Sequence, residues 1–250
     1  MTDVLSIHTK PNTTSFIVLD QNGDYFQKCM SMPRLWWDYE VKTLNLLCPM
    51  ESSHYNPFKY MQDGKDASMA AKYLMHYTAG PDDKNDKIDD TCVTAEGLAM
   101  ESILTGFISD SRIYQKTFNT LLSTVSENKT LNSLAAKGQE LLPKEDRALL
   151  MRFTETEMRD AAISCTSRLF TYDWDDILAM TSCDIVCLDE LTRKNTIIYI
   201  IGPTEDAGYL KFFSAMLITQ VLQYTFMRDG CTTGFYNYAD IFGNTPKTAC

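Results

Sequence analysis

The ends of the chain carry strand-like hydrophobic patterns. An unbroken apolar run from Phe16 to Leu19 ends at Asp20 and is followed by the turn-forming residues 21–23. A run without polar alternation is typical of a strand buried on both faces, as in a parallel sheet covered by helices. Further strands are predicted over residues 41–47, 196–201 and 235–240.

Between these strands the apolar residues recur at helical spacing. From Asp66 onward, small and apolar side chains at 67, 70, 71, 74 and 75 predict a helix that Gly80-Pro81 ends. A first helix is predicted over 25–32, and others follow over 94–109, 112–126, 131–142, 144 to about 170, and 208–228. Strands at both ends and only helices between them predict an α/β fold with a large inserted all-α domain.

This organisation predicts three segments. Residues 1–58 form the first part of a mostly parallel α/β core, 59–172 form the inserted all-α domain, and 173–250 return to the core. The longest apolar stretch, Phe212 to Leu222, is interrupted by polar residues and is shorter than the roughly 20 residues that a membrane span needs. No membrane-spanning segment is therefore predicted.

The charge balance argues against strong direct binding of DNA by this chain. The formal net charge is −10, and no stripe of Lys and Arg is visible along the sequence. Binding to a phosphate backbone requires clustered cations. The chain is therefore not expected to be a general nucleic-acid binder.

The cysteines do not form a recognisable disulfide or metal framework. Eight are present without framework spacing, and the N-terminus is polar rather than leader-like. We therefore expect reduced thiols in the cytoplasm. Cys183 and Cys187 lack the second ligand pair of a zinc site, and the acidic loop at residues 82–90 lacks the spacing of a calcium loop. No metal site is predicted from these residues.

Polar residues at the strand ends mark a candidate ligand-binding edge. Asp20 directly follows the first apolar strand, where open α/β sheets bind their ligands. Asp240 ends the last predicted strand in a similar way, although a strand-end turn is the alternative interpretation of this carboxylate. Gly23 suits a tight turn because glycine tolerates positive φ.

Several blocks in a fixed order carry a family resemblance. The most specific is Tyr55-Asn56-Pro57-Phe58, which follows the strand segment Leu44–Leu46. Further blocks are the turn at 20–24, Ala95-Glu96, and residues 161–169, 188–203 and 239–244. Together they resemble the TraG-type coupling proteins of conjugative type IV secretion systems. There the turn usually reads Asp-Pro-Lys-Gly-Glu, and the last block reads Asp-Glu-Phe-Ala-Asn.

The resemblance implies a RecA-like core of the P-loop NTPase type that carries an all-α domain. In that family a hexameric ATPase at the cytoplasmic face of the membrane passes relaxase-bound single-stranded DNA, or protein, to the secretion channel. The all-α domain is thought to receive the substrate. The implied cofactors of the intact family are ATP and Mg²⁺. The implied partners are relaxosome or secreted proteins, secretion-system components and sister subunits.

Three departures from the family bear on chemistry. Residues 1–12 contain no GxxxxGK[ST], and the chain begins about where the helix after that loop should end. Asn22 replaces the family Lys, and Ile241 replaces the acid that polarises the attacking water, so base catalysis at this position is lost. Asp20, Gly23 and Asp240 remain as candidates for positions near a nucleotide and Mg²⁺. We assign no catalytic residue and expect no ATP hydrolysis, and no cofactor, for this chain alone.

Three functions are consistent with these observations. The chain is the substrate-receiving and partial motor portion of a coupling protein, or a degenerate relative that caps or interferes with assembly of intact subunits. The third is an independent nucleotide-binding enzyme with Asp20 and Asp240 as Mg²⁺ ligands, against which the missing phosphate loop counts.

Overall fold

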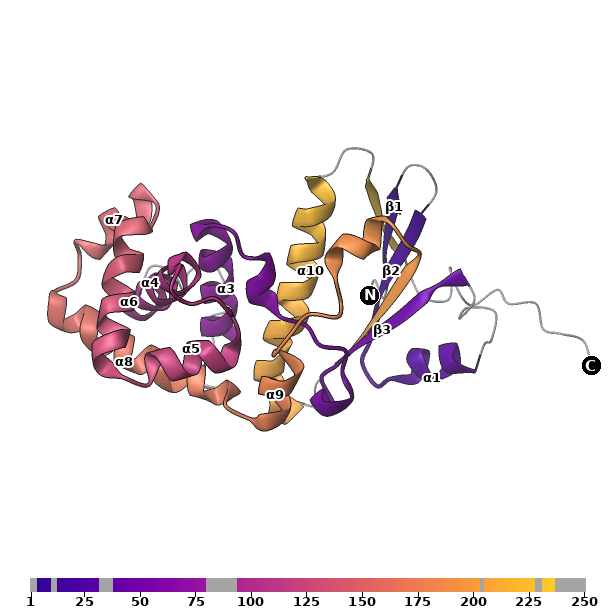
Figure 1. The fold of residues 1–250 in the computed structure, drawn as a ribbon, viewed down its shortest axis with the longest axis horizontal. Coiled ribbons are helices and arrows are strands. Elements are labelled where there is room, and N and C mark those ends of the chain that lie inside the picture. The colour runs from indigo at the N-terminus through magenta and orange to yellow at the C-terminus, as the bar shows by residue number, and fades with distance from the viewer. Residues whose placement is uncertain are drawn as a thin grey trace, which may run out of the picture. The chain divides into compact units, whose positions relative to one another are not determined.

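The chain divides into two compact units, which are described separately. A computed structural model describes residues 4–9, 13–31, 38–79, 94–202, 205–227 and 231–236 (Figure 1). The α/β unit comprises Met1–Tyr55, Asp184–Asp206 and Leu217–Cys250. The helical unit comprises Asn56–Cys183 and Ala207–Met216.

The α/β unit is built on a five-stranded mixed sheet with the order β3-β4-β2-β1-β5. The strands are β1 (Val4–Thr9), β2 (Thr13–Asp20), β3 (Glu40–Asn45), β4 (Thr196–Ile201) and β5 (Thr232–Tyr236). β4 pairs in parallel with both β2 and β3, whereas β1 pairs antiparallel with β2 and β5. The predicted α/β class is confirmed, and β2, β3 and β4 lie where the apolar runs predict strands.

Burial on both faces explains why these strands are apolar throughout. All six residues of β4, the strand between β3 and β2, are buried. Successive side chains of a strand point to opposite faces. Val18 and Tyr199 belong to a cluster with Cys29 of helix α1 (Asp24–Met30), and their sequence neighbours Ile17 and Ile198 are equally buried. The sheet therefore has an apolar layer on each side of its centre.

The N-terminal segment differs from the expectation. We expected a helix that follows a phosphate loop to end here, but Val4–Thr9 is a strand that forms an antiparallel pair with β2. The strand is missed because its apolar residues are interrupted by the buried Ser6, which donates a hydrogen bond to the carbonyl oxygen of Gly234. The last strand is also shifted, since β5 ends at Tyr236 and residues 237–240 lie outside the described residues.

The helices account for most of the remaining described residues. They are α1, α3 (Gly64–Tyr77), α4 (Ala95–Ser109), α5 (Phe118–Val125), α6 (Asn128–Leu141), α7 (Lys144–Leu150), α8 (Glu155–Leu169), α9 (Asp175–Met180) and α10 (Lys211–Phe226). Short 3₁₀ helices are η1 (Pro49–Glu51), η2 (Pro57–Tyr60), η4 (Phe170–Tyr172), η5 (Leu188–Thr192) and η6 (Glu205–Leu210). Within the described ranges, none of these helices combines the length and the hydrophobicity that crossing a bilayer requires.

Two predicted helices are shorter than expected. The helix predicted from residue 144 to about 170 breaks into α7 and α8, because Thr154 and Glu157 form a capping box that starts a new helix. The Thr-x-x-Glu spacing of this box is visible in the sequence. The helix predicted from residue 112 begins only at Phe118, because Thr117 caps its N-terminus by accepting a hydrogen bond from the amide of Thr120.

A close crossing of α4 and α6 organises the helical unit. Residues 97–107 of α4 are all buried, so this helix is the centre of the unit. A Cβ atom on Gly138 of α6 would overlap the carbonyl oxygen of Ser102, and one on Gly106 would overlap that of Leu134. The two backbones therefore approach to a distance that only glycine permits at both positions.

Replacing Gly138 by alanine tests this crossing. We expect Gly138→Ala to lower the free energy of unfolding by about 3 kcal/mol, because the helices must move apart to accommodate the methyl group. The matched control is Gly208→Ala, since a Cβ at Gly208 meets nothing within 4 Å. Urea denaturation followed by circular dichroism measures both changes. Equal stability of the two variants would contradict the proposed constraint.

A buried lysine holds the outer strand β3 to the segment that precedes β4. The ammonium group of Lys42, whose side chain is 4% exposed, donates to the carbonyl oxygens of Ile185 and Val186 at 3.0 Å. It also donates to Glu190 at 2.9 Å. The hydrogen bonds that Lys42 and Lys194 donate to Glu190 lower the pKa of this carboxyl group to about 2. Burial of this charge is therefore matched by three acceptors, as burial of an ammonium group requires.

Truncating this lysine tests the role of the charge. Lys42→Met retains much of the apolar stem but leaves two carbonyl groups without their donor. We expect the free energy of unfolding to fall by about 2–3 kcal/mol. Lys194→Met removes the other cation bound to Glu190, but its side chain is 57% exposed and the loss should stay within about 1 kcal/mol. Chemical denaturation compares the two, and a larger effect at Lys194 would refute this assignment.

Candidate functional site

The three parallel strands end together at one edge of the sheet. In the register of the sheet, Asp20 of β2 and Asn45 of β3 both align with Ile201 of β4. Main-chain hydrogen bonds continue just beyond the strand ends. The amide of Gly202 donates to the carbonyl oxygen of Asp20, and the amide of Leu46 donates to that of Ile201. This is the edge at which parallel α/β sheets bind their ligands.

Asp20 is directed toward the start of helix α1. The residue is 2% exposed, and its carboxylate accepts a 2.8 Å hydrogen bond from the main-chain amide of Phe26. Phe26 is the third residue of α1, whose first amides have no partner within the helix. The carboxylate therefore stabilises the N-terminus of α1 and is held at the sheet edge by that bond.

Gly23 has the turn conformation that the sequence predicts. Its φ angle is +80°, in the left-handed region that glycine adopts without steric cost. Its carbonyl oxygen accepts the first hydrogen bond of α1, from the amide of Gln27 at 3.0 Å. The structure thus brings Asp20 and Gly23 together around one helix start. Asp240 and Ile241 lie outside the described residues.

Asn45 is a polar residue at this edge that the sequence analysis did not single out. Its side-chain oxygen accepts hydrogen bonds of 3.1 Å from the amides of Leu47 and Cys48, which shape the loop after β3. The sequence signal that could have identified Asn45 is its position as a polar residue at the end of an apolar strand, which is also the position of Asp20. Asp20 and Asn45 therefore both hold backbone amides of the segments that follow their strands.

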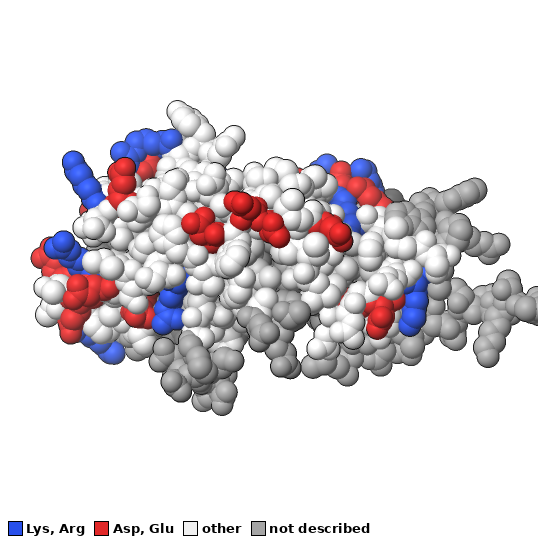
Figure 2. All heavy atoms as spheres, turned by 90° about the horizontal axis from the view of Figure 1, so that it is seen from below, with Lys and Arg blue, Asp and Glu red and all other residues white. Residues whose placement is uncertain are grey.

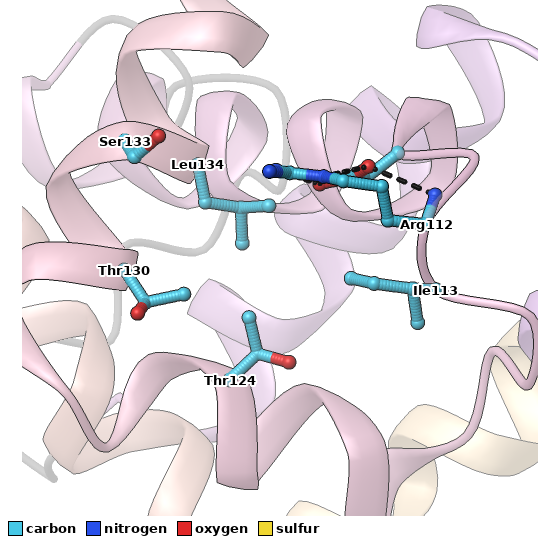
Figure 3. A pocket seen from close by; sticks show the side chains of 7 residues that line it. Arg112, Ile113, Thr124, Thr130, Ser133 and Leu134 are labelled. Carbon is cyan, nitrogen blue, oxygen red and sulfur yellow. Dashed lines mark hydrogen bonds and ion pairs between the residues drawn. The ribbon is translucent and has the colours of Figure 1, made fainter.

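The helical unit contains a pocket of about 350 Å³ beside the C-terminal end of α4. Figure 3 shows Ile113, Thr124, Thr130 and Leu134 around the cavity, with the Arg112 guanidinium across one side. Arg112 binds the buried carboxylate of Asp110, and these hydrogen bonds hold the pKa of Asp110 well below its ordinary value. The pocket thus combines aliphatic walls with an ion pair at its rim.

A second and larger pocket, of about 410 Å³, lies between helices α6, α7 and α8, and we call it the α6–α8 groove. Its lining is mixed, with six apolar residues and four polar ones: Ala135, Ala136, Leu150, Phe153, Met158 and Ala162, with Asn132, Gln139, Glu155 and Arg159. Met151, which follows α7, is 87% exposed. Exposed methionines are frequent on surfaces that bind proteins.

Several cations of the helical unit are engaged in its own structure. Lys137 lies 3.6 Å from the Asp110 carboxylate that binds Arg112, and Lys116 binds carbonyl groups at the end of α4. On the face drawn in Figure 2, Lys and Arg side chains lie among Asp and Glu and do not form one stripe.

The sheet, with its parallel strands ending at one edge, makes this an α/β protein. The same chain also contains a helical unit with open pockets. Comparison with protein families identifies the class more closely. Residues 9–236 match the family model described as "Type IV secretory system Conjugative DNA transfer". Because the match covers most of the chain, including residues of both units, the protein belongs to this family. The resemblance to TraG-type coupling proteins is thereby confirmed. A search of curated proteins found no match.

Substitution of Asp20 separates its structural role from other roles. Asp20→Ala removes the acceptor of the Phe26 amide, and we expect the free energy of unfolding to fall by about 1–2 kcal/mol. Asp20→Asn keeps a side-chain oxygen and should lose less than half of that amount. Thermal and urea denaturation of both variants provide the measurement. An alanine variant as stable as the parent would show that the hydrogen bond to α1 contributes nothing.

Proposed function

We propose that this chain receives transfer substrates for a conjugative type IV secretion system through its helical unit. The substrate is a DNA-bound relaxase or a secreted protein, and further partners are secretion-system components and sister subunits at the cytoplasmic face of the membrane. The observation that carries the proposal is the family match over residues 9–236.

The surface of the helical unit supports this proposal. The α6–α8 groove offers apolar residues for burial, and its polar residues Asn132, Gln139, Glu155 and Arg159 give directional contacts. Buried apolar contacts provide most of the affinity of such interfaces, whereas polar contacts select the partner. We therefore assign substrate contact to this groove rather than to the sheet edge, where Asp20 and Asn45 bind the chain's own amides.

We further propose that the chain does not hydrolyse ATP by itself. The Asp20 carboxylate, at the expected nucleotide-proximal position, accepts a hydrogen bond from the start of α1. The printed sequence also contains no GxxxxGK[ST], which supplies the phosphate-binding amides and the Lys in such enzymes. In an intact RecA-like motor of this family, such a phosphate-binding loop and its Lys would bind ATP for hydrolysis.

Blocking the groove tests the assignment of the substrate site. Ala136 is exposed on α6 within the groove, so Ala136→Trp should fill it without disturbing the core. We expect the affinity for the relaxase encoded by the same DNA element to fall at least about tenfold, since a blocked hot-spot region costs more than about 1.4 kcal/mol. The control is Asn119→Trp, an exposed position of the same unit on α5. An equal loss in both variants, or in neither, contradicts the groove assignment.

Titration with nucleotide tests the proposal that the chain does not hydrolyse ATP by itself. The purified chain should release no phosphate from ATP above the buffer rate, and calorimetry with ATP and Mg²⁺ should give no saturable heat. Asp20→Asn should leave both results unchanged. Saturable binding at micromolar ATP that the Asn variant loses would favour an independent nucleotide-binding enzyme instead.

A further inference from the structure

The central helix of the helical unit contains a buried acid without a hydrogen-bond partner. Glu101 of α4 is 0% exposed, and neither of its carboxylate oxygens has a partner among the described residues. The hydroxyl of Thr105, one turn later, is also buried and without a partner. Most buried polar groups in folded proteins are hydrogen-bonded, so two such residues on one helical face call for a physical explanation.

The surroundings of Glu101 do not compensate an ionised carboxylate. On α3, the Ser68 hydroxyl and the Lys72 ammonium favour the charged form without making a hydrogen bond of normal geometry to it. On α7, Asp146 disfavours it. Burial is the largest effect, and with the repulsion from Asp146 it raises the pKa of Glu101 to about 7 despite the opposing effects of Ser68 and Lys72.

Two cations on the other helices packed against α4 are bound elsewhere. Lys137 of α6 lies against Asp110, beyond the C-terminal end of α4. Arg168 of α8 binds Glu96, in the first turn of α4. The charged groups that act on the Glu101 carboxylate are therefore Lys72 of α3 and Asp146 of α7.

We propose that Glu101 makes the packing of α3 and α7 on α4 depend on pH. The protonated carboxyl remains in the interior, whereas the ionised carboxylate favours an opening that admits water. Because α4 and α6 are held in backbone contact at Gly106 and Gly138, the opening occurs on the α3 and α7 side. This pH dependence of the helix packing does not depend on which substrate the helical unit receives.

The sign of the effect follows from the direction of the pKa change. The closed unit binds the Glu101 proton more tightly than an opened or unfolded one, in which the pKa returns to 4.5. The contribution of Glu101 to stability is therefore fully present below about pH 4.5, falls as the pH rises toward 7, and is lost above it. Across that range the opening equilibrium should increase on the order of a hundredfold.

Hydrogen exchange of the full chain tests the proposal. After correction for the intrinsic exchange rate, protection of amides in α3, α4 and α7 should decrease on the order of a hundredfold between pH 5 and pH 8. In Glu101→Gln the decrease should vanish, because the amide does not titrate. The control Glu140→Gln alters an exposed residue of α6 and should retain it. A decrease that persists in Glu101→Gln overturns the proposal.

A second measurement does not depend on the folding of any variant. In the parent chain labelled with ¹³C at glutamate carboxyl groups, one resonance should titrate near pH 7. Assignment of that resonance comes from its absence in Glu101→Gln or, if that variant does not fold, from contacts to α3 methyl groups. A spectrum in which every glutamate titrates below pH 5.5 overturns the proposal.

Discussion

Parallel pairing between β2 and β4 is the constraint on which the rest of the structure depends. The two strands pair from Phe16 with Ile197 to Asp20 with Ile201, although nearly the whole helical segment lies between them in sequence. Closing so long a connection costs conformational entropy, which the burial of apolar side chains on both faces of the strands offsets. Only this pairing brings the ends of β2, β3 and β4 to one edge and places Asp20 beside Gly202.

The helical unit depends on a different kind of contact. Gly106 and Gly138 allow α4 and α6 to meet backbone to backbone, which fixes the central helix and leaves α7 and α8 to form the walls of the α6–α8 groove. The same helix carries the partnerless Glu101. The helical unit therefore combines one rigid crossing, a groove that α7 borders, and a buried acid whose ionisation loosens the packing of α3 and α7.

The sequence predicts the sheet better than it predicts the site. The unbroken run of β4 and the apolar end of β2 are visible because burial on both faces removes polar alternation. β1 is missed because its buried Ser6 is satisfied by the backbone of a distant strand, a partner that no local pattern reveals.

The break between α7 and α8 can be predicted from the Thr154-x-x-Glu157 capping box. The glycine crossing and the partnerless Glu101 were not, because both depend on which helices meet. Asp20 and Gly23 were placed correctly at the sheet edge, yet the bond from Asp20 to α1 requires coordinates.

Photo-crosslinking during substrate engagement tests the central claim most directly. A photoreactive amino acid replaces Gln139 in the α6–α8 groove, or exposed Lys28 on α1 of the α/β unit, and the chain is mixed with the relaxase of the same DNA element. If the helical unit receives the substrate, illumination gives relaxase adducts from position 139 and few or none from position 28. Adducts from position 28 with none from 139 would contradict the account.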